Sequence, residues 1–260
     1  GVAVRIAVLL KEVPDTYSDR EMNLQTGLTD RSGDVVADEV SERAVEAALR
    51  IAEAGENVEV EILSVGPESS ADSVRRGIAM GASDAYIVSD EALTGADVTL
   101  TAEVLAKLVE KQGYDLVIAG AESSDGGTGV IAPFIAELLD WPVLTNLTEL
   151  TLEGDTVRAT QASDAATAQL EAQLPAVVSV ADEFADPRFP NFKGLMAAKK
   201  KELHAITLAE LGVDPDDFTH PRAIMTSIER RPERERGEII DASSTAAARL
   251  VDFLESKNLI

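Results

Sequence analysis

The sequence contains no cysteine and only two histidines. Without cysteine, disulfide bonds, iron–sulfur clusters and thiol catalysis are excluded. His204 and His220 lie outside any ligand-spacing pattern, so we expect no metal site. No apolar run approaches the roughly 18–20 residues that cross a bilayer, and the apolar run at residues 6–10 is too short for a secretory signal. We therefore expect a cytoplasmic protein that is not an integral membrane protein.

Basic residues are scarce, with 23 lysines and arginines against 47 acids and a formal net charge of −24. Such a charge repels nucleic acid and anionic membranes, so neither is an expected partner. The acids are spread along the chain between intact apolar segments, which argues against an acidic disordered protein. An acidic surface on an ordinary core predicts a salt-adapted proteome, such as that of a halophilic archaeon, because salt screens the repulsion. An acidic mesophilic protein is the alternative.

Strand and helix patterns alternate over the first 140 residues. Short apolar or alternating segments predict strands at 4–10, 58–65, 84–88 and 116–119. Apolar residues at helical spacing predict helices at 39–54, 69–80, 96–112 and 129–139. This alternation is typical of an α/β fold with a doubly wound, mostly parallel sheet. We expect the strand order to reverse between the first and fourth strands, and a ligand to bind beyond their carboxyl ends.

The pattern changes after residue 143. Short strands are predicted at 147–152, 156–161, 168–173 and 176–180, which form a small extra β region. Beyond them we expect a Pro-containing loop running into a basic helix at 186–201, an exposed charged linker at 229–238 and an amphipathic helix at 243–255. The predicted division is a nucleotide-binding domain at 1–201, which includes a partner-recognition loop at 183–201, and a linker with a C-terminal helical arm at 202–260. We expect this arm to pack on a partner subunit, because its apolar stripe has no obvious place on its own domain.

The loop at residues 120–129 is the richest candidate ligand site, since it follows a buried strand and opens a helix. Gly126 and Gly127 allow the backbone to approach a ligand, and free N–H groups at a helix start attract phosphate. Further hydroxyl donors come from Ser123, Ser124 and Thr128. The loop is neither a Walker loop nor a Rossmann fingerprint. A surface turn without a ligand is the alternative.

Lys11 follows the first strand and could face a phosphate or a flavin anion, or else lie in solvent. Residues 186–196 form an apolar loop that is unusual in so acidic a chain, with two prolines, Phe189 and Phe192 ahead of a run of lysines. Prolines reduce the entropy lost on docking, and aromatic side chains anchor interfaces. The loop therefore predicts a partner-binding surface, with a buried connection as the alternative.

These segments together resemble the beta subunit of electron transfer flavoproteins over about residues 4–201. The family's Val-Lys-x-Val-Pro-Asp pattern is matched at 10–15, its Asp-Gly-x-Thr turn at 125–128 and its Leu-Pro-Ala-Val-Val run at 174–178. Its most specific signature, Glu-Pro-Arg-Tyr/Phe followed by an apolar residue, a Met and a Lys-rich turn, is matched at 186–201. Residues 38–40, 121–122 and 130 depart from the family pattern in side chains that would contact the nucleotide.

The resemblance implies an adenine nucleotide alpha hydrolase-like fold and an electron carrier rather than an enzyme. It implies AMP in this subunit, with FAD held mainly by an alpha subunit partner; FAD in this subunit, as in electron-bifurcating members, is the alternative. The implied cofactor-binding residues are Leu9, Lys11, Asp38, Val65, Gly120, Ser123, Asp125, Gly126, Gly127, Thr128, Gly129, Val130 and Ile131. The implied partner-recognition residues are Pro187, Arg188, Phe189, Phe192, Leu195 and Met196.

The resemblance also implies partners beyond the alpha subunit: acyl-CoA and related dehydrogenases as electron donors, and a quinone oxidoreductase as acceptor. Two other classes share this type of fold. An ATP pyrophosphatase requires a Ser-Gly-Gly-x-Asp-Ser loop after the first strand, which residues 11–15 do not match. A universal stress protein, an ATP-binding module, would account for the first 140 residues only. No nucleophile–base pair or catalytic carboxylate pair is recognisable in the sequence, which favours a carrier.

Overall fold

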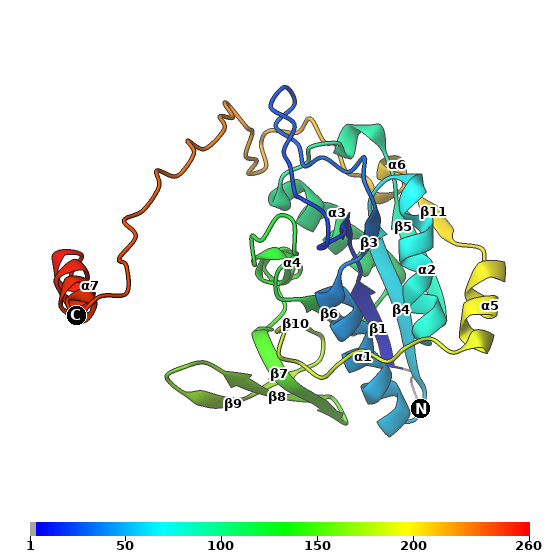
Figure 1. Cartoon of the computed structure of the whole chain (residues 1–260). Coiled ribbons are helices and arrows are strands. Elements are labelled where there is room, and N and C mark those ends of the chain that lie inside the picture. Colours follow the sequence, from blue (N-terminus) through cyan, green and yellow to red (C-terminus); the bar gives the residue numbers. More distant parts are fainter. Residues whose placement is uncertain (1–3) are drawn as a thin grey trace. The chain divides into compact units, whose positions relative to one another are not determined.

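The computed structural model describes residues 4–260, which divide into a large unit that ends at Thr226 and a small unit, Ser227–Ile260 (Figure 1). The large unit is built on a nine-stranded sheet in the order β11-β5-β4-β1-β6-β10-β7-β8-β9. Its strands are β1 (Val4–Leu9), β4 (Val58–Val65), β5 (Asp84–Val88), β6 (Leu116–Gly120), β7 (Val143–Glu153), β8 (Thr156–Ala162), β9 (Thr167–Gln173), β10 (Ala176–Val180) and β11 (His204–Ile206). The strands from β11 to β7 pair in parallel, and β7, β8 and β9 pair antiparallel. The predicted doubly wound, mostly parallel sheet is confirmed.

The strand order reverses at β1, which pairs with β4 on one side and β6 on the other. This is the predicted switch point, since β6 is the fourth strand expected from the sequence. A short antiparallel ribbon of β2 (Glu12–Pro14) and β3 (Val35–Ala37) follows β1 beyond its carboxyl end. The sequence did not reveal this ribbon or β11, because three-residue strands carry too little periodicity to be recognised.

Helices cover both faces of the sheet (Figure 1). They are α1 (Glu39–Ala54), α2 (Ala71–Met80), α3 (Val98–Gln112), α4 (Ile131–Leu139), α5 (Phe192–Lys200) and α6 (Leu208–Leu211), with short 3-10 turns at Glu68–Ser70 and Glu91–Leu93. Side chains alternate along β1, so Ile6 and Val8 join the core under α1 and α2, whereas Ala7 and Leu9 join the core under α3 and α4. Two apolar cores separated by one sheet explain why the parallel strands are apolar throughout.

Four helices begin two or three residues later than expected, with α2 at Ala71 in place of 69 and α7 (Ala246–Ser256) at Ala246 in place of 243. The other two late starts have a visible cause. The helix expected from residue 96 begins at Val98, because the Asp97 side chain accepts the N–H of Leu100 and caps it there. The helix expected from residue 129 begins at Ile131, since Gly127 and Gly129 have φ values of 62° and 67° and keep the chain out of a right-handed helix. The strand expected at 147–152 is longer and covers Val143–Glu153.

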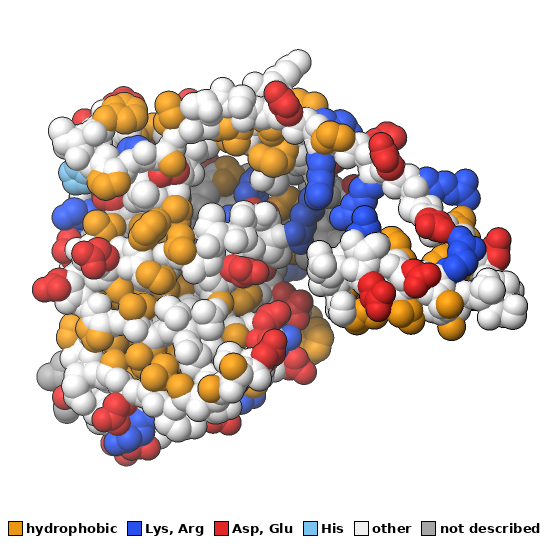
Figure 2. Space-filling model, turned by 90° about the vertical axis from the view of Figure 1, so that its left-hand side faces the viewer, with side chains coloured by type: hydrophobic (Ala, Val, Ile, Leu, Met, Phe, Trp, Pro, Cys, Tyr) orange, Lys and Arg blue, Asp and Glu red, His pale blue; other side chains and the backbone are white. Residues whose placement is uncertain are grey.

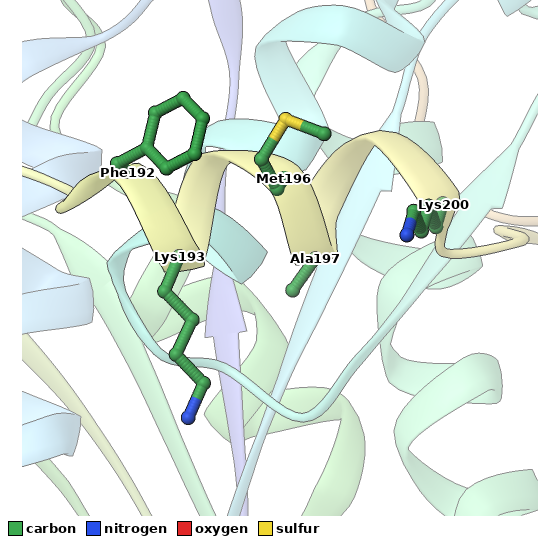
Figure 3. Close-up of a pocket in the computed structure, with 5 residues that line it drawn as sticks. All are labelled: Phe192, Lys193, Met196, Ala197 and Lys200. Carbon is green, nitrogen blue, oxygen red and sulfur yellow. The ribbon is translucent and has the colours of Figure 1, made fainter.

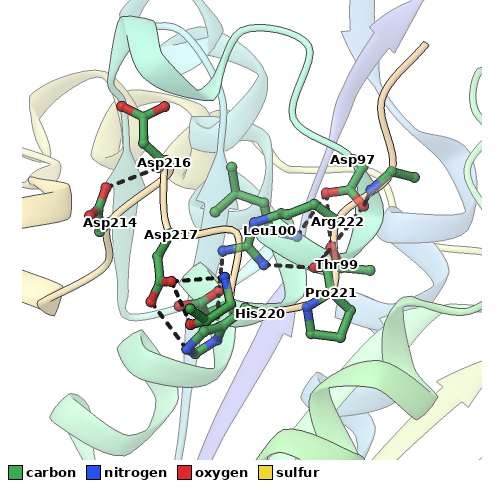
Figure 4. A network of polar contacts seen from close by, with 12 residues as sticks. Asp97, Thr99, Leu100, Asp214, Asp216, Asp217, His220, Pro221 and Arg222 are labelled. Atoms are coloured by element: carbon green, nitrogen blue, oxygen red, sulfur yellow. Dashed lines mark hydrogen bonds and ion pairs between the residues drawn. The ribbon is translucent and has the colours of Figure 1, made fainter. Parts of the chain in front are cut away.

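The large unit continues beyond the boundary expected after residue 201. Strand β11 pairs with β5, and α6 packs against α3. The following segment crosses the start of α3, where Thr99 Oγ1 donates to the Pro221 carbonyl at 2.6 Å and Ala223 N–H donates to Asp97 Oδ2 at 2.8 Å (Figure 4). Arg222 pairs with Glu103 at 2.5 Å, with both side chains almost buried. These contacts hold residues 202–226 on the sheet unit.

The small unit contains one helix, α7 (Ala246–Ser256), preceded by an extended charged linker. The amphipathic helix expected at 243–255 therefore exists, but no residue of α7 is buried. Its exposed apolar side chains include Leu250, Val251 and Phe253. Among residues 4–260, no helix combines the length and apolarity that a membrane crossing requires. On the face seen in Figure 2, acidic side chains lie at several separate places, as expected from their even spread along the sequence.

Candidate nucleotide site and docking segment

The glycine-rich loop leaves the sheet at Gly120, the last residue of β6, beside the carboxyl end of β1. A Cβ at Gly120 would lie 2.6 Å from Val40 Cγ1 and 3.1 Å from the Val40 carbonyl carbon. The start of α1 therefore packs directly on this backbone, and any side chain at residue 120 would push the two apart. Leu9 and Val65 end the adjacent strands β1 and β4, so they share this edge of the sheet.

Asp125 is the electrostatic centre of the loop. Its side chain is 1% exposed and pairs with Lys11 Nζ at 2.8 Å and with Arg31 Nη2 at 2.5 Å. Burial alone would raise the pKa of Asp125, but the hydrogen bond and charge of Lys11 and the hydrogen bonds of Gly126 and Ser123 together hold the pKa well below its usual range. The carboxylate stays ionised and ties the end of β1 to the loop. Lys11 thus does not simply lie in solvent. Arg31 also belongs to the site, although no sequence pattern around it indicated this.

Asp38 makes the second tie, from α1 to the loop. Its carboxylate accepts the N–H of Ser124 at 2.9 Å, and the residue is only 2% exposed. Burial raises the pKa of Asp38, even though the hydrogen bond from Ser124 opposes the shift. Asp38 and Lys11 therefore hold the loop from two different elements.

The turn itself is held by Ser123. Its carbonyl accepts the N–H of Gly127 at 3.0 Å, and its hydroxyl accepts the N–H of Gly126 at 3.2 Å. Gly126 N–H also donates to Asp125 Oδ1 at 2.6 Å. The N–H groups of the two glycines thus bond within the loop in this conformation, although we predicted that they would face a phosphate.

Helix α4 follows the loop and has no side-chain cap at its N-terminus, where Val130 takes the capping position. The first N–H groups of an α-helix lack partners within the helix and carry the positive end of its dipole. Thr128, Gly129 and Val130 lead into this start, and Thr128 and Gly129 are exposed. The geometry therefore leaves the start of α4 at Ile131 open to an anion. Asp125, earlier in the same loop, holds Lys11 and Arg31.

A hollow of about 650 Å³ borders the other side of the loop, between the start of α1 and the ends of β6 and β10. Sequence reasoning did not find it, because its lining comes from five separate segments. One base, Arg43, faces the acids Asp38, Glu39, Glu122, Asp182 and Glu183. The Ser124 hydroxyl, which also lines the hollow, is buried without a hydrogen-bond partner among the described residues.

The predicted partner-recognition residues lie in one stretch that ends in α5. Asn191 caps this helix by accepting the N–H of Gly194 at 2.8 Å. Phe189 and Phe192 are 88% and 79% exposed, and Leu195 and Met196 are also exposed. Phe192 and Met196 project from the same side of α5 and border a shallow depression with Lys193, Ala197 and Lys200 (Figure 3). Exposed apolar side chains of this size on one helix are typical of an interaction surface.

Arg188 differs from its neighbours, because it is turned toward its own chain. Its Nε lies 2.7 Å from Glu46 Oε2 on α1, and its guanidinium also pairs with Glu53. Hydrogen bonds to Glu53 and Glu46 raise the pKa of Arg188 above its already high value. Pro187 beside it is partly buried. The structure thus shows an internal ion pair where the sequence predicted a contact to a partner.

The fold and this loop define a doubly wound α/β protein with its ligand edge at the point where the strand order reverses. The model of the electron transfer flavoprotein domain matches residues 26–211. The electron transfer flavoprotein subunit beta of Mycobacterium tuberculosis is 40% identical over 263 residues, which cover 98% of this chain and 99% of the relative. That of Thermoanaerobacterium thermosaccharolyticum is 33% identical over 264 residues, 99% of this chain and 100% of the relative.

A further relative, subunit CarD of the caffeyl-CoA reductase-Etf complex of Acetobacterium woodii, is 30% identical over 264 residues, 99% of this chain and 100% of the relative. The chain belongs to the electron transfer flavoprotein family, among the beta subunits. These subunits form one half of a heterodimer that serves electron transport. This confirms the family predicted from the sequence, in place of the ATP pyrophosphatase and universal stress alternatives.

Proposed function

We propose that this subunit holds AMP at the loop between β6 and α4 and presents α5 to the dehydrogenases that reduce the flavoprotein. The observation that carries the proposal is the exposure of Phe189, Phe192 and Met196 on a well-capped segment of an otherwise acidic protein. Electrons would pass from acyl-CoA and related dehydrogenases, through FAD held mainly by the alpha subunit, to a quinone oxidoreductase. FAD would supply the redox chemistry when bound, and this chain would dock the flavoprotein on its partners without acting as an enzyme.

The residues at the loop fit a nucleotide phosphate. Gly120 brings the loop backbone against α1, the start of α4 carries no side-chain cap, and Lys11 and Arg31 add two positive charges against one on Asp125. Residues 128–131, with Lys11, would hold the phosphate, and Gly126 and Gly127 would let the loop backbone come close to it. Leu9 and Val65 would lie beside the nucleoside at the strand ends. Ala121 and Val130 offer no side-chain hydrogen bond to a flavin ring, which supports AMP over a second FAD.

Counting nucleotides in the purified heterodimer tests this assignment. We expect one AMP and one FAD per heterodimer, measured by chromatography of the acid-released nucleotides and by flavin absorbance. Two FAD and no AMP would refute the AMP assignment and establish the alternative of an electron-bifurcating type. A heterodimer that contains only the FAD of the alpha subunit, and no AMP, would show that the loop is not a nucleotide site.

Replacing the aromatic anchor tests the docking surface. Truncating a central aromatic anchor at an interface costs about 2 kcal/mol or more, which is roughly a thirtyfold loss of affinity. Phe192→Ala should therefore slow reduction by a cognate acyl-CoA dehydrogenase at subsaturating concentrations, with flavin content unchanged. Glu153→Ala, at the exposed end of β7, is the surface control. Equal reduction rates for the two variants would show that the segment is structural.

The charge of −24 further supports a protein from a salt-adapted organism, such as a halophilic archaeon. The large unit carries buried apolar cores of ordinary composition, so the excess of exposed acids concerns its solubility and not its fold. Location in the cytoplasm would fit the high internal salt of such cells.

A further inference from the structure

The segment that precedes the docking helix is fastened to α1 at three points. Arg188 pairs with Glu46 and Glu53, Arg43 donates a hydrogen bond to the Phe184 carbonyl, and Arg43 Nη2 lies 3.2 Å from Asp186 Oδ1. Residues 184–188 therefore run across α1 and are held by side chains from positions one turn or more apart. Phe184 adds a buried apolar contact at the beginning of this run.

Glu46 makes this fastening stronger than a surface ion pair. Its side chain is 6% exposed and is shared by Arg188 at 2.7 Å and Arg50 at 3.1 Å. A buried carboxylate is costly without a partner, whereas an exposed ion pair contributes little. The planar guanidinium of Arg188 can bind Glu46 and Glu53 at once, which a lysine ammonium does not match in geometry. The pair therefore selects one position of the segment.

We infer that Arg188 is a positioning residue that sets the docking helix α5 against the body of the subunit, and that it acts through Glu46 and Glu53 and not through contact with the dehydrogenase. The inference rests on the proposed docking function of α5. Only three residues, Phe189, Pro190 and Asn191, separate Arg188 from the first residue of α5. A displacement of the backbone at Arg188 would therefore also displace Phe192.

A loosened segment would still hold its docking side chains, but less often in the competent position. The apparent affinity for a partner falls in proportion to the fraction of molecules in that position. If the fraction drops to roughly 0.1–0.2, the Michaelis constant for the flavoprotein rises about five- to tenfold. The limiting rate at saturation stays the same, because the flavin environment and the docked geometry are unchanged.

The experiment compares variants of the complete heterodimer in steady-state reduction by an acyl-CoA dehydrogenase from the same organism. Arg188→Ala should raise KM about five- to tenfold with kcat retained, and Arg188→Lys should raise it less. Glu53→Ala should also raise KM, by about two- to threefold, although Glu53 lies on α1. Glu56→Ala removes an equal charge from an exposed residue just beyond α1 and should leave KM unchanged.

Hydrogen exchange supplies a readout that does not depend on the dehydrogenase. Amides in residues 185–200 should exchange faster in Arg188→Ala than in the wild type, with little change in β1 or β6. The double variant Arg188→Ala/Glu53→Ala should match Arg188→Ala alone, since both substitutions break one interaction.

The outcomes separate the inference from the docking assignment. A raised KM for Arg188→Ala beside a Glu53→Ala variant that behaves like Glu56→Ala would show that Arg188 touches the partner, which overturns the inference. Unchanged exchange in residues 185–200 of Arg188→Ala would overturn it as well. A wild-type KM for Phe192→Ala would refute the docking function itself.

Discussion

Gly194 brings the backbone of α5, the proposed docking helix, into close contact with α2. It lies in the first turn of α5, and a Cβ placed there would come 2.3 Å from the Ala79 carbonyl oxygen on α2. Non-bonded heavy atoms prefer separations of about 3.5 Å, so Gly194→Ala requires a displacement of about 1 Å. The contacting atom belongs to the backbone, so a change of side-chain rotamer cannot relieve the clash.

The size of the effect follows from two opposing contributions. Overpacking of this kind costs about 1–3 kcal/mol, and alanine in place of glycine regains up to about 1 kcal/mol of helix propensity. At the middle of the overpacking range the net loss is therefore about 1 kcal/mol, or a fall of roughly 2–4 °C in Tm at about 2–4 °C per kcal/mol. Because Ala198 is the one buried residue of α5, we expect the helix to tilt outward and take much of the strain.

Thermal unfolding and dehydrogenase reduction of the heterodimer would measure both consequences. We expect a lower Tm and a KM raised about three- to tenfold, since a tilted α5 presents Phe192 and Met196 in the wrong place. Gly33→Ala is the matched control, because nothing lies within 4 Å of its Cβ position. If Gly194→Ala equals Gly33→Ala in both assays, contact with α2 does not position the docking helix.

Four further predictions concern the other parts of the chain. Gly120→Ala should reduce bound AMP per heterodimer, because its Cβ would push Val40 and the loop apart; retention of full AMP content would contradict the cradle. Asp125→Asn should be less stable than wild type at pH 7, and the gap should narrow as pH falls below about 4, since a carboxylate with a depressed folded pKa stabilises only while it is ionised; a constant gap in Tm from pH 7 to pH 3 would contradict this. The heterodimer should melt at a higher temperature in 2 M KCl, in the molar range where the screening length is about 3 Å or less, than in dilute buffer, and equal melting temperatures would refute salt adaptation. Phe253→Asp should weaken assembly with the alpha subunit by tenfold or more, as burying a side chain of this size contributes about 1.5–3 kcal/mol, while Asp252→Asn on the same helix serves as the control; unaltered association by light scattering would show that α7 is not an assembly element.

Residue patterns within single segments account for the helices and strands of this protein and for their arrangement in the sheet. The apolar run of β1, the alternation in β4 and the helical spacing of α1 each follow from neighbours within one segment, so their types were predictable, and α1, β4, β5 and β10 have the predicted bounds. Alternation of these elements leaves few topologies, and the reversal of strand order beside β1 followed from them. The loop after β6 was recognisable because glycines and hydroxyl residues mark a break between two regular elements.

The contacts at the two proposed sites have no signature in the local sequence. Asp125 pairs with Lys11 and Arg31, which lie about a hundred residues earlier in the chain. No pattern in the intervening residues predicts these contacts. From the sequence, Arg188 is expected to be an exposed base. It pairs with Glu46 only because the fold places α1 beside it. Such pairs depend on which elements the sheet places side by side. Burial then decides their strength, because a carboxylate removed from water binds its cation far more tightly than one on the surface.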